Sequence, residues 1–212
     1  MLRWRAVWTV GWVAVVFAIG AGAQPPAKRP SNAALRKAFE RNRDAVVEVW
    51  SSRGRGVGVI VGDAGQIATS VDHVDLSNAT VRLAGRERPA KVTLADARLK
   101  IALLEPEIDP DERHVAVAVD AKAPLTPGTW LVGIDRPVKK RGGVTPFAGR
   151  ILRSARAGDP FVVTDLPLGP GSPLFDVRGR LVAIAVQRMG RIGSRAVLVS
   201  RLQTQVARDA GP

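Results

Sequence analysis

Few side chains in this 212-residue sequence have the acid–base or nucleophilic properties that catalysis needs. The chain has two histidines, His73 and His114, and no cysteine. A hydroxyl nucleophile, an imidazole base and a carboxylate together perform acyl transfer when the fold brings them into contact. Ser172, His73 and Asp96 are the candidates for such a set. Whether the three meet depends on the elements that carry them.

Ser172 lies in a glycine-rich segment, residues 168–176, with the sequence LGPGSPLFD. An apolar run at 161–165 precedes the segment, and a turn at 177–180 leads into a second apolar run at 181–186. This order predicts a strand, a glycine-rich loop that carries a serine, a strand, a tight turn and a last strand. The loop is therefore the first place to look for a nucleophile.

Other kinds of site find little support in the sequence. Two isolated histidines without any cysteine make a poor set of metal ligands. Phosphate-binding and dinucleotide-binding fingerprints are absent, and the alternation of Gly54, Gly56 and Gly58 is better explained by a β-hairpin. The sequence predicts neither a metal nor a cofactor.

The chain is strongly basic, with a formal net charge of +13. Such a charge favours anionic partners, among them lipid head groups, acidic polysaccharides and nucleic acid. The stretches that could bind a polyanion are residues 139–141 and the arginines Arg150, Arg153 and Arg156. Arginine outnumbers lysine 25 to 7 and is spread along the chain. The nucleotide composition of the genome explains this pattern as well as a binding surface does. No specific nucleic acid is predicted.

The first 23 residues have the pattern of a secretory signal peptide. Arg3 and Arg5 precede an apolar run at 6–19, and the small residues at 21–23 provide a cleavage site. The prediction is export to the periplasm or the medium. The alternative is an uncleaved anchor, because residues 6–23 approach the length needed to cross a bilayer. Residues 24–44 follow as a proline-rich tether and a short helix, with Ser31 and Asn32 as candidate N-caps.

From residue 45 the hydrophobic period changes from helical to strand-like. Six short strands are expected within 45–106, at 46–50, 57–61, 66–70, 79–83, 89–94 and 101–104. Six more are expected within 107–212, at 114–119, 129–134, 147–153, 161–164, 181–186 and 196–199. Residues 200–210 then have helical spacing. The spacing predicts an all-β protein of two six-stranded antiparallel barrels, with a short helix at each end.

Several strings, taken in order, resemble the trypsin-like serine protease superfamily, and within it the HtrA (DegP) type. They are AVVEV at 45–49, GVGVIV at 56–61, GQIATSVDHV at 65–74, KIALL at 100–104, PGTWLVGI at 127–134, GSPLF at 171–175 and AVLV at 196–199. The resemblance covers residues 45–207 and implies a double barrel of the chymotrypsin type. No PDZ-sized segment follows, so the resemblance implies a protease domain alone.

The resemblance also implies a catalytic triad, from which this chain departs at three positions. The ungapped match places Asp72 where the family has its histidine, Lys100 where it has its aspartate, and Pro170 where it has its serine. His73 comes one residue late, and in an extended strand it would point away from the cleft unless a one-residue bulge turned it back. Lysine cannot accept the imidazole N–H. Proline has neither a hydroxyl nor an N–H for an oxyanion.

The sequence therefore predicts an exported protein with a protease fold and no catalytic residues. Such a pseudoprotease would bind a peptide or protein in the cleft between its barrels by strand addition. The first alternative is an active serine endopeptidase that uses His73, Asp96 and Ser172, although Asp96 also fits a turn. The second alternative is a cationic envelope protein that binds polyanions. The oligomeric state is not predicted.

Overall fold

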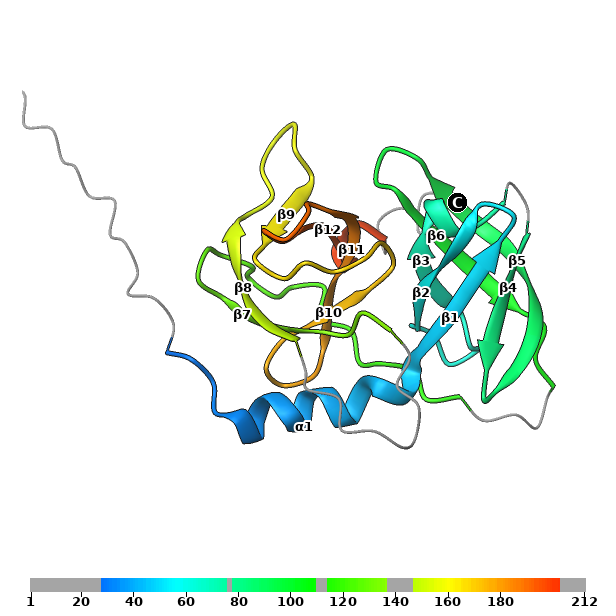
Figure 1. Ribbon diagram of the computed structural model, residues 1–212, viewed down its shortest axis with the longest axis horizontal. Helices are drawn as coiled ribbons and strands as arrows, with labels where there is room; N and C mark the ends of the chain where they lie inside the picture. Colours follow the sequence, from blue (N-terminus) through cyan, green and yellow to red (C-terminus); the bar gives the residue numbers. More distant parts are fainter. Residues whose placement is uncertain (1–27, 76–77, 110–113, 137–146, 203–212) are drawn as a thin grey trace, which may run out of the picture.

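Short strands with buried inner faces dominate the structure, a computed structural model that describes residues 28–75, 78–109, 114–136 and 147–202. These strands form two closed antiparallel barrels of six strands each, and one helix, α1, precedes them (Figure 1). The predicted fold class is confirmed. The predicted signal peptide at 1–23 lies outside the described residues.

The first barrel lies within residues 46–106, and its strands pair in the order β1-β2-β3-β6-β5-β4, with β4 closing on β1. The strands are β1 (Val46–Ser51), β2 (Gly54–Ile60), β3 (Ile67–Ser70), β4 (Asn78–Leu83), β5 (Arg86–Asp96) and β6 (Ile101–Pro106). All four residues of β3 are buried, because one face of this strand lies in the barrel interior and the strand also contacts β11 of the second barrel. The longer β5 alternates exposed and buried residues, as expected of a strand with one face in water.

The second barrel repeats the strand order of the first. Read from β7, its strands pair as β7-β8-β9-β12-β11-β10, with β10 closing on β7. The strands are β7 (Trp130–Gly133), β8 (Phe147–Arg153), β9 (Phe161–Thr164), β10 (Pro173–Phe175), β11 (Leu181–Arg188) and β12 (Ser194–Leu198). The two barrels thus share a topology, although their sequences show no repeat.

One strand expected in the second half is wrong. Residues 114–119 form no strand and instead run as a connection between the barrels, where the N–H of Val117 donates to the carbonyl of Ile60 and Val119 bridges Leu181. The valines of this segment alternate with alanines, which gives a strand-like pattern in the sequence, but Val117 is buried whereas Val115 is exposed, so the segment has no continuous inner face. The sixth strand of this barrel is β10, the three-residue strand that the sequence predicted between the glycine-rich loop and the tight turn.

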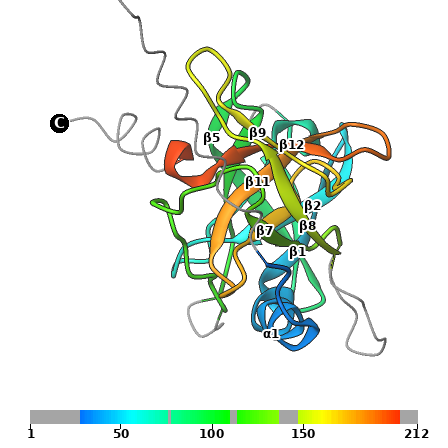
Figure 2. The ribbon, with the colours of Figure 1, turned by 90° about the vertical axis from the view of Figure 1, so that its left-hand side faces the viewer.

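The helix α1 (Asn32–Asn42) starts as predicted, with the hydroxyl of Ser31 accepting the N–H of Ala34 at 3.2 Å. Although α1 leads into the first barrel, it lies along the second (Figures 1 and 2). The buried amide of Asn42 donates to the carbonyl of Gly179 in the turn after β10 at 2.9 Å. The helix therefore ties the second barrel to the start of the first.

The main hydrophobic cluster crosses the boundary between the barrels. It contains Ile67 and Leu104 of the first barrel together with Phe175 and Ile184 of the second, all buried. A second cluster fills the rest of the second barrel. A helical turn starts at Val199, and the remainder of the predicted C-terminal helix lies outside the described residues from 203 on. In the described part of the chain no helix is long and apolar enough to span a membrane.

Candidate functional site

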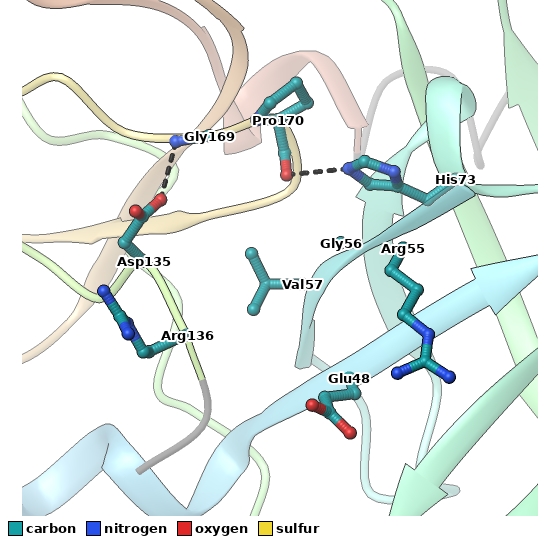
Figure 3. Close-up of a pocket in the computed structure, with 9 residues that line it drawn as sticks. All are labelled: Glu48, Arg55, Gly56, Val57, His73, Asp135, Arg136, Gly169 and Pro170. Atoms are coloured by element: carbon teal, nitrogen blue, oxygen red, sulfur yellow. Dashed lines mark hydrogen bonds between the residues drawn. The ribbon is translucent and has the colours of Figure 1, made fainter. Parts of the chain in front are cut away.

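A pocket of about 290 Å³ lies where the two barrels meet (Figure 3). Both barrels contribute to its wall, and it holds both cationic and anionic side chains. The lining residues are Glu48, Arg55, Gly56, Val57 and His73 from the first barrel, and Asp135, Arg136, Gly169 and Pro170 from the second. The pocket therefore brings His73 together with the glycine-rich loop that the sequence singled out.

His73 faces this pocket, which corrects the expectation that it would point away. The chain leaves its extended conformation after β3 and forms a 3-10 turn, Val71–His73, capped by the hydroxyl of Ser70 accepting the N–H of Asp72 at 3.2 Å. Side chains do not alternate in such a turn, so the one-residue offset does not reverse the imidazole. Asp72 is exposed, and only 8% of the surface of His73 is exposed.

Gly56 on β2 makes room for the imidazole. A Cβ atom at position 56 would lie 2.0 Å from Nε2 of His73, far inside van der Waals contact. The Gly-x-Gly pattern of the second strand therefore has a local reason beyond the hairpin, because any larger residue at 56 would have to displace the imidazole. The first barrel holds His73 at the pocket wall by packing.

The partner of the imidazole is a backbone carbonyl. Nε2 of His73 lies 3.1 Å from the carbonyl oxygen of Pro170 (Figure 3). A carbonyl oxygen accepts hydrogen bonds and cannot donate them, so Nε2 must carry the proton. A general base for a serine nucleophile needs a lone pair at the nitrogen that faces the hydroxyl. The tautomer that this contact selects is therefore the wrong one for that role.

The loop that presents Pro170 is a tight turn. The N–H of Ser172 donates to the carbonyl of Gly169 at 3.3 Å, Pro170 occupies the second position, and Gly171 follows with φ +82°. This combination is that of a type II β-turn. The Pro170–Gly171 peptide is trans, so its C=O and N–H point in opposite directions. The C=O faces His73 and the N–H donates to Ala185 at 2.7 Å.

No N–H of the loop is left to face an oxyanion. Pro170 has none, and every other N–H from 168 to 172 has an acceptor inside the protein. The pairs are Leu168 to the carbonyl of Leu166 (2.9 Å), Gly169 to Oδ1 of Asp135 (2.6 Å), Gly171 to the carbonyl of Ala185 (2.7 Å) and Ser172 to the carbonyl of Gly169 (3.3 Å). An oxyanion hole requires preorganised donors aimed at the reacting oxygen, and this loop offers none.

Ser172 lies on the inner side of the turn and is fully buried. Its hydroxyl donates to Oδ1 of Asp135 at 2.9 Å. The imidazole and the hydroxyl of the alternative triad thus have different partners, Pro170 and Asp135. Sequence reasoning did not identify Asp135, which comes two residues after β7 and directly after the matched string at 127–134. The one sequence feature that pointed to Asp135 was the position of a carboxylate just after a predicted strand.

The carboxylate expected behind the imidazole is missing as well. Oδ1 of Asp96 accepts the N–H groups of Arg98 and Leu99, both at 2.8 Å, which makes it a turn aspartate. Lys100 has φ +58° and its carbonyl accepts the N–H of Val71, so it borders the turn that carries His73. Among the described residues no carboxylate is hydrogen-bonded to His73.

Glu48, one of the carboxylates that line the pocket, forms an ion pair with Arg82. Arg82 donates to Glu48 and to Glu87, both at 2.7 Å, and its guanidinium lies 5.3 Å from the ring centre of Trp50. The hydrogen bond to Glu87, together with the negative charge of Glu48, raises the pKa of Arg82 above its usual value. Arg55 covers the same Trp50 ring at 5.7 Å.

The predicted polyanion stretches are only partly described. Two of the three arginines pair with carboxylates, Arg150 with Asp165 at 3.7 Å and Arg153 with Asp159 at 2.7 Å. Residues 139–141 lie outside the described residues. His114, the other histidine, lies beside Gly65, away from the residues that line the pocket.

Comparison with known proteins identifies relatives of this chain. A "probable periplasmic serine endoprotease DegP-like" of Ectopseudomonas mendocina is 32% identical over 188 residues, covering 82% of this chain and 39% of that protein. A protein of the same description from Halomonas elongata is 28% identical over 165 residues, covering 74% of this chain and 34% of that protein. The chain thus spans well under half the length of these relatives.

A solved structure has the same fold. The serine endoprotease from Yersinia pestis superposes with a TM-score of 0.65 at 23% identity, covering 85% of this chain and 66% of that one. Residues 56–184 match the family described as "Trypsin-like peptidase domain", which includes His73 and the whole loop at 168–176. The chain belongs to the trypsin-like peptidase domain family, in the branch of the HtrA (DegP) proteases.

Proposed function

We propose that this protein is a pseudoprotease that binds extended peptide segments in the cleft between its barrels without cleaving them. The contact between Nε2 of His73 and the carbonyl of Pro170 carries the proposal. In a serine protease a hydroxyl occupies that side of the imidazole. Here a hydrogen-bond acceptor occupies it, and the loop around it has no free N–H.

Without a hydroxyl beside the imidazole and without free N–H groups in the loop, the site has little from which catalysis can arise. Removing a triad member from a serine protease leaves on the order of 10³–10⁴-fold acceleration over water, which comes from the oxyanion hole and substrate binding. In this chain the N–H groups of the loop are already paired, so the residual acceleration falls further. The alternative active endopeptidase finds no support, because Ser172, Asp96 and His73 each have other partners.

A strand edge next to the pocket supports peptide binding. On the β10 side, the last contacts along β11 are those of Ala185 with Gly171 and Ser172. β11 continues to Arg188, and among the described residues no strand pairs with it there on that side. An extended peptide can add to such an edge through its own N–H and C=O groups, which needs no catalytic residue.

The test uses two pools of fluorescein-labelled random decapeptides. One pool is unmodified, and the other is N-methylated at every second residue, so that the side chains are the same and strand pairing is blocked. We expect binding of the unmodified pool by fluorescence anisotropy, at least about tenfold weaker binding of the methylated pool, and no cleavage products by mass spectrometry. Equal binding of both pools, or cleavage that Ser172→Ala abolishes, contradicts the proposal.

We also propose that the protein works in the periplasm. The predicted signal peptide and the names of the relatives, which describe periplasmic proteins, support this location. N-terminal sequencing of the protein recovered from the periplasm tests it. A mature N-terminus at Gln24 is expected, and an intact Met1 contradicts cleavage.

A further inference from the structure

One carboxylate oxygen holds both ends of the turn that carries Pro170. Oδ1 of Asp135 accepts the N–H of Gly169 at 2.6 Å and the hydroxyl of Ser172 at 2.9 Å. These are the first and the last residues of the four-residue turn. Figure 3 shows Asp135 opposite His73 in the pocket, with its bond to Gly169 drawn.

The hydroxyl of Ser172 depends on this carboxylate for its hydrogen bond. Ser172 is fully buried, so its hydroxyl has no access to bulk water. A buried donor that loses its acceptor is costly, and an acceptor that carries a charge forms the stronger bond. A Cβ atom at position 169 would lie 3.2 Å from Oδ1 of Asp135, so the carboxylate and the turn are in close contact. The position of the turn is therefore sensitive to this one side chain.

The same turn sets the direction of the carbonyl that meets His73. Gly171 donates to Ala185 on one side, and Asp135 fixes residues 169 and 172 on the other. With both sides held, the Pro170–Gly171 peptide cannot rotate, and its C=O remains aimed at Nε2 of His73. Any freedom at residue 169 or 172 would allow this peptide to turn.

We propose that Asp135 is a positioning residue that keeps the imidazole of His73 capped by the carbonyl of Pro170. Asp135 acts through the turn and has no bond to His73 itself. The capped imidazole is a second feature that opposes peptide-bond cleavage by this protein, in addition to the absence of a hydroxyl at position 170. It does not depend on peptide binding, so a failure of the peptide experiment leaves it standing.

The experiment follows the Nε2 proton of His73 by NMR of the full chain with ¹⁵N-labelled histidine. His114→Gln identifies the His73 signal, since the chain has two histidines. We expect the wild type to show a hydrogen-bonded proton on Nε2. Asp135→Ala should speed exchange of that proton by about tenfold or more, as expected when its hydrogen bond is lost. Asp135→Asn keeps an acceptor oxygen and should retain most of the protection.

The matched control is Asp176→Ala in the same barrel. Oδ1 of Asp176 likewise accepts two hydrogen bonds at a turn, from the N–H groups of Arg178 and Arg180, both at 2.9 Å, while its Oδ2 pairs with the Arg180 guanidinium. This variant should lower stability without changing the His73 signal. Ser172→Ala removes one of the two bonds to Asp135 and should produce an intermediate exchange rate, which gives a result even if Asp135→Ala fails to fold. An unchanged signal in Ser172→Ala and Asp135→Ala, or an equal change in Asp176→Ala, overturns the proposal.

Discussion

The two barrels have the same strand order, yet they contribute different kinds of groups to the cleft between them. The first barrel keeps an imidazole in the cleft, with Gly56 leaving room for it and a 3-10 turn aiming it. The second barrel presents Pro170 and a turn whose N–H groups are all paired within the protein. One barrel retains a feature of a protease site, and the other has replaced it with internal hydrogen bonds.

The difference shows that the turn at Pro170, where the resemblance places the nucleophile, is held by hydrogen bonds within the protein. The turn at 169–172 is bonded to Ala185 and to Asp135, and Ser172 is fully buried. The N–H groups of Gly169, Gly171 and Ser172 thus all have acceptors within the protein. The double barrel therefore positions a well-ordered loop whether or not that loop performs chemistry.

The largest effect should follow from breaking the contact between the barrels at Gly171. A Cβ there would lie 1.9 Å from the carbonyl oxygen of Val57 on β2. We expect Gly171→Ala to lower the free energy of unfolding by about 3 kcal/mol, because a backbone clash adds to the strain of a positive φ. Denaturant unfolding measures this.

Gly158 offers a matched control, with φ +80° and nothing within 4 Å of the added Cβ. Gly158→Ala should therefore cost only the backbone strain, about 1 kcal/mol. Equal losses at positions 158 and 171 would mean that the loop is not docked on the first barrel.

A smaller effect should follow on the first-barrel side, from Gly56→Ala. The added Cβ meets the imidazole of His73, a side chain that can move, so we expect a loss of about 1–2 kcal/mol. A double-mutant cycle with His73→Ala measures the clash directly. The loss at Gly56 should largely vanish in the His73→Ala background, and additive losses would place the imidazole elsewhere.

These contrasts also show what the sequence could predict. Strand periodicity located most strands, and the ungapped match at 171–175 indicated the residue now seen beside the imidazole, Pro170. The predicted orientation of His73 was wrong because alternation holds only in strands, and His73 lies in a 3-10 turn that follows β3. Asp135 was missed because its partners lie 34 and 37 residues away, a distance that no local pattern spans.

Acid should weaken the second barrel through Asp159. The hydrogen bond from Arg153 holds the pKa of this carboxyl below 3.8, and the bonds from Phe161 N–H and Arg195 add to the shift. A lowered pKa in the folded state stabilises the protein fully above the unfolded value of 3.8 and ceases to do so as the pH falls through the folded pKa. Asp159→Asn should therefore lower the melting temperature slightly at pH 6 and have no effect near pH 2. An equal effect at both pH values would contradict this assignment.

The smallest effect concerns the basic surface. Because Arg150 and Arg153 are paired with carboxylates, we expect Arg153→Gln to leave retention on heparin almost unchanged. Replacement of residues 139–141 by glutamine at the same salt concentration is the comparison, and it tests the polyanion hypothesis where the charges are clustered. A large decrease from Arg153→Gln would instead assign heparin binding to the end of β8.

The most direct test of the central claim is the reaction of the purified protein with a fluorophosphonate, followed by intact mass spectrometry. Such a probe phosphonylates an activated serine and requires both a hydroxyl and a base beside it. With Pro170 facing His73 and Ser172 bonded to Asp135, we predict no adduct in the wild type or in Ser172→Ala. A stoichiometric adduct that disappears in both Ser172→Ala and His73→Ala would contradict this account.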